Sequence, residues 1–229
     1  DDMSPRAVDV LKAVDLVAAE DTRHSSRLFS HFGIKTPMVS YHDHSDNKQI
    51  HTILDMLLCG KSVALISDAG TPLISDPGYR LVKTIRKKGL KIVPIPGSCA
   101  LIAAISASGL SSDRFIFEGF LPAKSAGRIS KLKSVAEERR TLMFYEAPHR
   151  ILETLTDMIG VFGEGRQVVI ARELTKTYET FLSGPLADVL LQVKADDNQQ
   201  KGEIVLVVEG SSLPEKDPDD VEAKRILSI

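Results

Sequence analysis

The sequence has little of several features that would place the protein in a specialised class. Only two of its 229 residues are cysteines, Cys59 and Cys99, and they match no metal-ligand spacing, so we interpret them as reduced thiols of a cytosolic protein. No apolar run approaches the roughly 20 residues that a membrane-spanning helix needs. The opening residues, Asp-Asp-Met-Ser-Pro, do not resemble a signal peptide. We therefore expect a cytoplasmic protein without a membrane partner.

The sequence also lacks an excess of charge of either sign. It has 29 Lys and Arg against 31 Asp and Glu, which gives a net charge of −2. A protein that coats nucleic acid by bulk electrostatics is usually far more basic, so any RNA contact must come from a local basic patch. With 43% hydrophobic and 26% charged residues, the composition is that of an ordinary globular protein, long enough for one large domain or two small ones.

Helical and strand patterns alternate along most of the chain. Ser4 and Pro5 predict the N-cap and first residue of a helix, and Gly33 predicts a left-handed helix end. Val63–Ile66 is a continuous apolar run, which is typical of a strand buried on both faces of a parallel sheet. A further strand is expected over Ile92–Ile95. The pattern predicts an α/β domain with a mostly parallel sheet.

The pattern changes between Asp113 and Pro122, where we place a domain boundary. The prediction is an N-terminal α/β domain over residues 1–115 and a C-terminal α/β domain over residues 116–210. In the second domain we expect a basic helix over Lys124–Glu138 and a last strand over Glu203–Val208. The polar segment 211–229 has the composition of a linker.

Four loops at the ends of expected strands carry unusual residues: 20–24, 67–78, 94–100 and 145–150. Ligands of an open parallel sheet bind at the carboxyl ends of its strands. The loop 67–78 is longer than a plain turn and rich in small residues, which let a ligand approach the backbone closely. It lacks both the Gly-x-Gly-x-x-Gly pattern of dinucleotide folds and the Gly-Lys-Ser/Thr of a P-loop. It therefore favours a small ligand that carries no phosphate.

Simpler explanations remain open for these loops. The loop 20–24 could be a capped helix start, and the loop 94–100 could serve only tight helix packing. Glu146 and Arg150 could simply pair and cap a helix. His42 and His44, two positions apart without further clustered ligands, are weak support for a metal site, so no metal is expected.

The order of the motifs is more specific than any single motif. They are Ala19–His24, His42–His44, Asp68–Gly78, Pro96–Ser98, Glu118–Pro122, Tyr145–Glu146 with His149–Arg150, Ala171–Lys176 and Lys201–Glu203. In this order they resemble the tetrapyrrole-methylase superfamily. Within it, they are most similar to the bacterial ribosomal RNA methyltransferases that modify the 2′-hydroxyl of a cytidine in the decoding centre. The resemblance runs from residue 1 to about Gly210.

The resemblance implies a two-domain class III methyltransferase fold, in which each domain is a mostly parallel or mixed sheet flanked by helices. It implies a homodimer that binds S-adenosylmethionine, folded in the cleft between the domains, and no metal. Members of the family begin with a strand and loop before the position of Asp1 and extend beyond Gly210, so part of the active site is expected to be missing. The implied cofactor-binding residues are Asp68, Ala69, Gly70, Thr71, Ile74, Ser98, Tyr145, Ala171, Leu174, Gly202 and Glu203.

Methylation of a ribose hydroxyl needs an oriented nucleophile and a proton acceptor. The candidates on the expected cleft loops are Asp21, His42, Glu146 and Glu173. Histidine side chains titrate nearest neutrality, whereas a carboxylate needs desolvation to become an effective base. Our hypothesis is that Asp21 and Glu146 position or deprotonate the hydroxyl, while Arg23 and Arg150 hold the RNA backbone. Which residue is the base stays open.

The expected RNA-binding patch lies on one basic helix. It comprises Lys124, Arg128, Lys131 and Lys133, with Arg150 nearby in sequence order. A solvated helix face is the simpler explanation for any one of them, and the run Arg86–Lys88 is better explained by the helix dipole. The expected partner is small-subunit ribosomal RNA, either free or in the 30S particle. The alternative substrate for the same fold is a corrin or porphyrin precursor. A nicotinamide-dependent reductase and a non-catalytic RNA-binding module are less consistent with the motifs.

Overall fold

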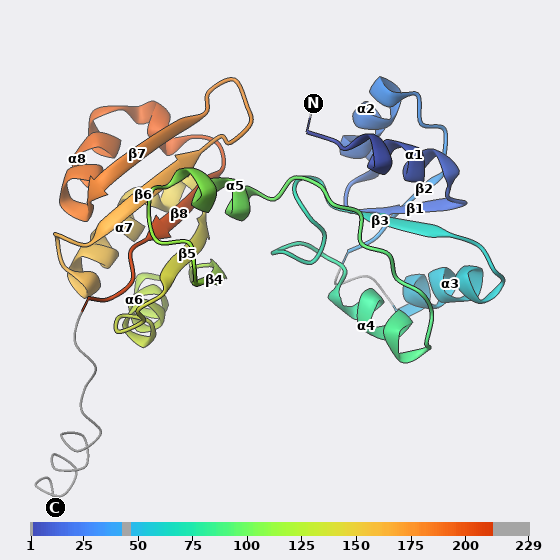
Figure 1. Cartoon of the computed structure of the whole chain (residues 1–229), viewed down its shortest axis with the longest axis horizontal. Helices are drawn as coiled ribbons and strands as arrows, with labels where there is room; N and C mark the ends of the chain where they lie inside the picture. Colours follow the sequence, from blue (N-terminus) through green and yellow to red (C-terminus); the bar gives the residue numbers. More distant parts are fainter. Residues whose placement is uncertain (1, 43–46, 213–229) are drawn as a thin grey trace, which may run out of the picture. The chain divides into compact units, whose positions relative to one another are not determined.

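A computed structural model describes residues 2–42 and 47–212. The chain divides into two compact units, Asp1–Ala103 and Ala104–Ile229, which we call unit 1 and unit 2 (Figure 1). The division lies within α5 (Ala100–Ala107), earlier in the chain than the expected boundary at residue 115. Asp43 and His44 of the expected histidine motif lie outside the described residues, as does the expected tail from residue 213 onward.

Unit 1 contains a three-stranded parallel sheet with the strand order β2-β1-β3. The strands are β1 (Leu16–Ala19), β2 (Met38–Ser40) and β3 (Val63–Ile66). Every residue of the central strand β1 is buried, as expected for a parallel sheet that is covered on both faces. Ala19 is in register with Ser40 on one side and with Ile66 on the other, so the three strands end at the same edge.

Helices cover both faces of this sheet. They are α1 (Pro5–Ala13), α2 (Thr22–Phe32), α3 (Asn47–Leu58) and α4 (Tyr79–Lys87). Val17 packs with Leu11 of α1 and Phe29 of α2, whereas its neighbour Ala18 packs in a second cluster that includes Ile53 of α3 and Leu81 of α4. Because successive strand residues point to opposite faces, α1 and α2 cover one face and α3 and α4 cover the other.

The local signals in unit 1 had mixed outcomes. Ser4 is the N-cap of α1 and accepts a hydrogen bond from the Ala7 amide, and Gly33 ends α2 at φ 62°, so both of these predictions are confirmed. The predicted strand over Ile92–Ile95 is wrong, because the segment is not a strand. Among the described residues no strand pairs with it, and Ile92 instead packs partly buried against the cluster that contains Leu81.

Unit 2 contains a five-stranded mixed sheet with the order β4-β5-β8-β6-β7. The strands are β4 (Phe115–Phe120), β5 (Thr141–Glu146), β6 (Gln167–Arg172), β7 (Thr180–Pro185) and β8 (Ile204–Val208). Only β4 and β5 are parallel, and the other pairs are antiparallel. Among the strands of the described residues β8 comes last in the sequence, but it occupies the centre of the sheet, between β5 and β6 (Figure 1).

The helices of unit 2 pack on one face of this sheet. They are α6 (Ser125–Ser134), α7 (Ile151–Phe162) and α8 (Leu186–Ala195), with short 3-10 helices η1 (Pro148–Arg150) and η2 (Asp197–Gln200). Leu142, Ile170 and Leu206 of three adjacent strands share one core with Leu155 of α7 and Val189 of α8. α6 is shorter than the helix predicted over Lys124–Glu138. Both units thus have the predicted α/β architecture of a sheet flanked by helices.

Candidate functional site

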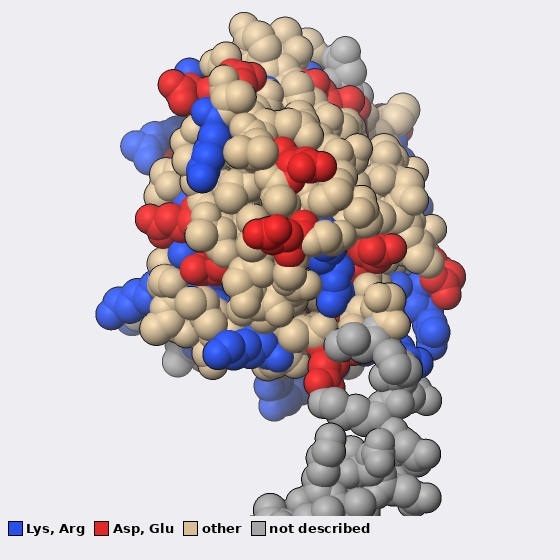
Figure 2. All heavy atoms as spheres, turned by 90° about the vertical axis from the view of Figure 1, so that its left-hand side faces the viewer, with Lys and Arg blue, Asp and Glu red and all other residues tan. Residues whose placement is uncertain are grey.

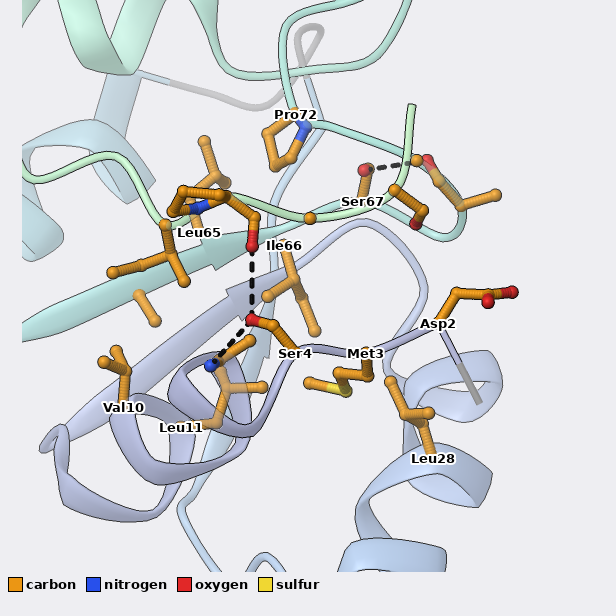
Figure 3. A pocket seen from close by; sticks show the side chains of 18 of the residues that line it. Asp2, Met3, Ser4, Val10, Leu11, Leu28, Leu65, Ile66, Ser67 and Pro72 are labelled. Carbon is orange, nitrogen blue, oxygen red and sulfur yellow. Dashed lines mark hydrogen bonds between the residues drawn. The ribbon is translucent and has the colours of Figure 1, made fainter. Parts of the chain in front are cut away.

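Unit 1 has a cavity of about 350 Å³ beside the end of β3 (Figure 3). This volume is at the lower end of the range for small-molecule pockets, roughly 300–1,000 Å³. The start of α1, one side of α2, the end of β3 with its loop, and the segment 95–98 form the walls. Lining residues include Met3, Ser4, Leu28, Phe32, Ile66, Asp68, Ala69, Gly70, Pro96 and Ser98. Apolar and small residues dominate the lining, as is usual for ligand pockets.

Two loops that follow neighbouring strands are locked together at the mouth of this cavity. An oxygen of the Asp68 side chain accepts a hydrogen bond from the Asp21 amide at 3.0 Å, and a Glu20 oxygen accepts one from the Asp68 amide at 3.2 Å. The exchange is possible because β1 and β3 are parallel and end in register. Sequence analysis placed Glu20 in a motif without a role. Its position, directly after a buried strand, was the available signal.

The segment 96–98 is tied to the same site by two hydroxyl groups. Thr71 Oγ1 donates to the Ser98 carbonyl at 2.9 Å, and Ser4 Oγ donates to the Pro96 carbonyl at 3.2 Å, the bond drawn from Ser4 in Figure 3. Of the residues predicted to bind a cofactor in unit 1, Asp68, Ala69, Gly70 and Ser98 line the cavity. Thr71 supports the wall through its hydrogen bond. Ile74 is outside the lining, and its amide donates to the Thr71 carbonyl at 3.2 Å.

Backbone strain is concentrated in two of the predicted loops. Among the described residues, the non-glycine residues with positive φ are Leu73 at 74°, Ser75 at 64°, Glu173 at 51° and Thr175 at 64°. Such a conformation costs on the order of 1–3 kcal/mol per residue and persists where the surroundings enforce it, often at binding sites. The loop 67–78 of unit 1 and the loop after β6 of unit 2 are therefore both functional candidates on geometric grounds.

In unit 2, Glu173 joins the loop after β6 to the turn before β8. Its Oε1 accepts hydrogen bonds from the Glu203 amide and the Lys176 ammonium group, each at 2.8 Å. The hydrogen bond from Lys176 is the largest cause of a lowered pKa of Glu173. A Cβ at Gly202 would displace the Glu173 carboxylate, and the φ of +82° at Gly202 also favours glycine. Glu173 was considered as a proton acceptor, but its carboxylate is already committed to these donors.

Arg172, which is only 5% exposed, also connects the loop after β6 to the turn before β8. Its guanidinium donates to the Tyr178 carbonyl at 2.9 Å and to the Lys201 carbonyl at 3.3 Å. Leu174, Gly202 and Glu203, all predicted to bind a cofactor, thus belong to one braced region. The role of Arg172 was not predictable from the sequence, because its burial depends on segments distant in the chain.

Two other predicted cofactor residues of unit 2 have different environments. Tyr145, at the end of β5, makes edge-on ring contacts with Phe117 and Phe120, at centroid distances of 4.8 and 5.6 Å. Ala171 is 0% exposed and is paired on both sides, with Phe181 of β7 and Val205 of β8. Its side chain is therefore buried on one face of the sheet, and its role in cofactor binding stays a prediction.

Asp21, predicted to be catalytic, is the N-cap of α2. Its carboxylate accepts hydrogen bonds from the amides of Arg23 at 2.8 Å and His24 at 3.4 Å, and it pairs with the Arg23 guanidinium at 3.2 Å. The Arg23 side chain, foremost among several donors, lowers the pKa of Asp21. A carboxylate with a lowered pKa is a poorer proton acceptor. The geometry therefore supports a positioning role for Asp21 and leaves the 91% exposed Arg23 side chain facing solvent.

His42 follows β2 at the same edge of the sheet. Its Nε2 lies 2.9 Å from Ser40 Oγ, and Ser40 Oγ donates to the Glu20 carbonyl at 3.3 Å. The imidazole is exposed. His42, Asp21 and Asp68 thus all follow strands that end in register, which brings these predicted residues to one edge of the sheet.

Glu146 and Arg150 form a buried pair in unit 2. The Glu146 side chain is 0% exposed and accepts from the Ala147 amide at 2.7 Å, from Arg150 at 2.6 Å and from Thr154 Oγ1 at 2.6 Å. The Arg150 side chain is only 15% exposed. The simpler explanation, that these residues pair and fix the start of a helix, is the one that the geometry supports. The catalytic role of Glu146 and the RNA-binding role of Arg150 stay predictions.

The predicted RNA-binding patch on α6 is smaller than expected. Arg128 is 1% exposed and pairs with Asp157 at 2.6 Å and Glu153 at 3.2 Å, so it is a buried link between α6 and α7. Lys131 pairs with Glu118 at 2.5 Å. Only Lys124 and Lys133 of the predicted set remain exposed without such a pair. The face of unit 2 in Figure 2 likewise carries acidic and basic side chains interspersed.

Two searches of the described residues concern metals and membranes. Residues 2–42 and 47–212 contain no group of three or more His, Cys, Asp or Glu side chains placed to hold a metal ion. No helix in the same ranges has the length and apolar character needed to cross a membrane.

The fold and the braced loops define a class of protein. The chain belongs to the tetrapyrrole (corrin/porphyrin) methylases, whose family model matches residues 1–190. It is 59% identical over 230 residues to a protein of Pseudomonas aeruginosa named ribosomal RNA small subunit methyltransferase I, a match that covers 100% of this chain and 82% of the relative. A protein of the same name from Escherichia coli O157:H7 is 55% identical over 229 residues and is covered to 79% of its length.

Solved structures confirm the predicted fold. Diphthine synthase superimposes with a TM-score of 0.67 at 18% identity, covering 98% of this chain and 90% of that one. Cobalt precorrin-4 methyltransferase superimposes with a TM-score of 0.66 at 16% identity, covering 90% of this chain and 89% of that one. At such identities the likeness concerns the fold alone. Membership of a methylase family makes the chain a methyltransferase, which requires a methyl donor.

Proposed function

We propose that the protein transfers a methyl group from S-adenosylmethionine to the 2′-hydroxyl of a cytidine in 16S ribosomal RNA. The observation that carries the proposal is the 59% identity, over the whole chain, to a relative named for methylation of small-subunit ribosomal RNA. The resemblance of the motifs to the ribose-methylating branch of the family is the basis for naming the 2′-hydroxyl and the cytidine as the target.

The cavity of unit 1 is suited to part of this methyl donor. The backbone N–H groups of Ala69, Gly70 and Ser98 donate to no acceptor within the described ranges, so they are available to a ligand. Asp68 adds negative charge beside the cavity, which favours a donor that bears a positively charged sulfur. S-adenosylmethionine supplies an activated methyl group when bound. The residues that would hold it in unit 1 are Asp68, Ala69, Gly70 and Ser98, supported by Thr71.

For the reaction, the ribose oxygen must gain the methyl group and lose its proton. Of the predicted catalytic residues, Asp21 is engaged by Arg23 and Glu146 is buried. His42 is exposed at the sheet edge that carries Asp68, and we assign it as the proton acceptor. Asp21 would position the loop in which it stands. A His42→Asn variant should lose turnover while it retains affinity for the donor.

The alternative substrate, a corrin or porphyrin precursor, has weaker support. The solved structures named for such substrates are only 16–17% identical to this chain, whereas the relatives from Pseudomonas aeruginosa and Escherichia coli, at 59% and 55% identity, are named for ribosomal RNA. The proposal includes a cytoplasmic location and a homodimer, both on the basis of the family resemblance. Sedimentation velocity of the protein tests the dimer.

The decisive experiment combines donor binding with methyl transfer. Calorimetry measures the affinity for S-adenosylmethionine, and radiolabelled donor reports transfer into small ribosomal subunits that lack the modification. Nuclease digestion of the RNA should release labelled 2′-O-methylcytidine. No incorporation into RNA, together with binding of a coloured tetrapyrrole, would replace the proposal by its alternative.

A matched pair of variants tests the site itself. Thr71→Val removes the hydrogen bond to the Ser98 carbonyl, and Thr52→Val removes a comparable hydroxyl that donates to the Lys48 carbonyl on the surface of α3. A lost hydrogen bond is worth about 0.5–1.5 kcal/mol, which corresponds to roughly 2- to 12-fold in affinity. Thr71→Val should weaken donor binding by such a factor and Thr52→Val should not. Equal affinities for both variants would remove the cavity from the model of the donor site.

A further inference from the structure

The outer face of α4 carries basic side chains along its whole length. Leu81 and Ile85 are buried on the inner face of this helix. The opposite face, repeated at helical spacing, is exposed and consists of Tyr79, Arg80, Lys83, Arg86 and Lys87. We call these five residues the α4 face. Residues 77–112 contain no Asp or Glu, so Lys88 and Lys91, which follow the helix, extend a region of one sign of charge.

The helix dipole explains only part of this charge. Arg86 and Lys87 are in the last turn of α4, where a positive charge is favourable. Arg80 stands in the first turn, where the dipole disfavours a cation by a similar amount. Within the described residues, Lys83, Arg86 and Lys87 form no salt bridge, although exposed acidic side chains are common elsewhere in the chain. A chain with a net charge of −2 has therefore segregated unpaired cations on one helix.

An exposed aromatic ring lies among these cations. Tyr79 is 60% exposed, and the Lys83 ammonium group lies 5.3 Å from the centre of its ring. Single exposed apolar side chains are common on protein surfaces, so the ring matters here because a cation lies beside it. Aromatic rings next to basic side chains are a typical means of binding single-stranded RNA, because the bases stack on the ring while the cations contact phosphates.

The α4 face is rigidly connected to the candidate donor site. The helix begins directly after the strained loop 67–78. A side chain at Gly78 would lie 2.7 Å from a Leu65 methyl group and 2.8 Å from one of Leu73, so the start of α4 packs tightly against β3. Leu65 also lines the cavity. A nucleic acid bound to α4 would thus be bound to the helix that directly follows the loop 67–78 of the donor site.

We propose that the α4 face binds the phosphate backbone of the RNA substrate, with an unpaired base stacked on Tyr79. The inference rests on the proposed function. It assigns to the α4 face the RNA-binding role that was predicted for the patch on α6. RNA fits this face better than an acidic protein surface, since RNA offers both regularly spaced phosphates and aromatic bases. Phosphate contacts of this kind release counterions, so they lower the affinity as salt is added.

Three sets of charge-neutralising variants separate the candidates. The first set is Lys83→Gln, Arg86→Gln and Lys87→Gln on α4, and the second is Lys124→Gln and Lys133→Gln on α6. The matched control changes three exposed lysines on other helices, Lys12→Gln, Lys48→Gln and Lys194→Gln. Each protein is tested for binding to unmodified small subunits across a salt series, for methyl transfer and for S-adenosylmethionine affinity.

The α4 variant should lower the slope of log affinity against log salt by about 0.7–0.9 for each lost phosphate contact. Its KM for the subunits should rise by about ten-fold or more, while kcat and donor affinity stay those of the unchanged protein. Tyr79→Ala should raise KM by about five-fold or more, and Tyr79→Phe should restore it, since stacking needs the ring and not the hydroxyl.

The outcomes distinguish failure of RNA binding by the α4 face from failure of the proposed methyltransferase function. If the unchanged protein methylates the subunits but the α4 variant keeps the same salt slope and KM, the α4 inference is wrong and the proposed function stands. A loss confined to the α6 variant would transfer the role to Lys124 and Lys133. If the unchanged protein transfers no methyl group to RNA, the proposed function itself fails.

Discussion

Replacing Gly202 by alanine tests whether Glu173 braces the two loops of unit 2. Gly202 has φ +82°, and an added methyl group would overlap the Glu173 carboxylate. That carboxylate accepts from the Glu203 amide and from Lys176, so it cannot move away without losing these bonds. The substitution therefore adds displacement of Glu173 to the strain of the backbone.

The expected loss of stability is the sum of the backbone strain at position 202 and the loss of a hydrogen bond to Glu173. A left-handed conformation costs alanine about 1–2 kcal/mol. Loss of a hydrogen bond to a charged group adds about 1.5–3 kcal/mol, because the Glu173 side chain is 17% exposed and only weakly compensated by water. Gly202→Ala should therefore destabilise unit 2 by about 2.5–5 kcal/mol. Gly109→Ala is the matched control, since Gly109 also lies in unit 2 at φ +72° but has nothing within 4 Å of an added methyl group.

Hydrogen exchange of the β6 and β8 amides measures the opening free energy of the sheet in each variant. The difference between Gly202→Ala and Gly109→Ala should fall to near zero when Glu173 is also changed to alanine. Equal destabilisation by the two glycine substitutions with Glu173 in place would refute the bracing role.

Three further predictions concern single side chains. Arg128→Met should lower stability by about 3–5 kcal/mol in thermal unfolding because it leaves the largely buried Asp157 carboxylate without its guanidinium partner, whereas Lys133→Met, at an exposed position, should change it by less than about 0.5 kcal/mol. Glu146→Gln should lower the melting temperature and leave kcat nearly unchanged, and a loss of kcat at unchanged stability would restore Glu146 as a catalytic residue. Hydrogen bonds from Arg140 lower the pKa of Glu138 from 4.5 to about 2, so its stabilising contribution is complete above pH 4.5 and is lost as the pH falls towards 2. Glu138→Gln should flatten the loss of stability in that window during acid titration, and an unchanged profile would contradict the ion pair.

Local sequence signals predicted the parts of the fold that depend on a few neighbouring residues. The Ser4 cap and the Gly33 helix end are set within one helical turn, and both are confirmed. Val63–Ile66 forms the predicted strand, in parallel register with β1, but its residues are only partly buried instead of being buried on both faces. Ile92–Ile95 has the same apolar character but no neighbouring strand in the described residues, and an apolar run alone does not specify whether a partner exists.

The candidate site was predicted unevenly for a similar reason. Residue type and position after a strand placed Asp68 at the cavity, since the ends of parallel strands meet at one edge. Ser98 also lines the cavity, although the strand predicted before it is absent from the structure. They were not enough for Arg128 and Glu146, whose side chains are buried by partners in other elements. The type of a charged residue does not indicate whether its side chain is exposed to solvent or buried. Burial had to come from the tertiary structure.

The central position of β8 has a consequence for the order in which the protein is made. β5 and β6 do not pair with each other, and β8 supplies the partner of both. As the polypeptide emerges from the ribosome, unit 2 can form only its β4-β5 pair and its β6-β7 hairpin until residues 204–208 are available. By then the three described strands of unit 1 have all been made. During synthesis the edges of β5 and β6 that pair with β8 therefore stay unpaired until β8 is made. A chain that stops before residue 204 keeps both edges exposed and prone to aggregation.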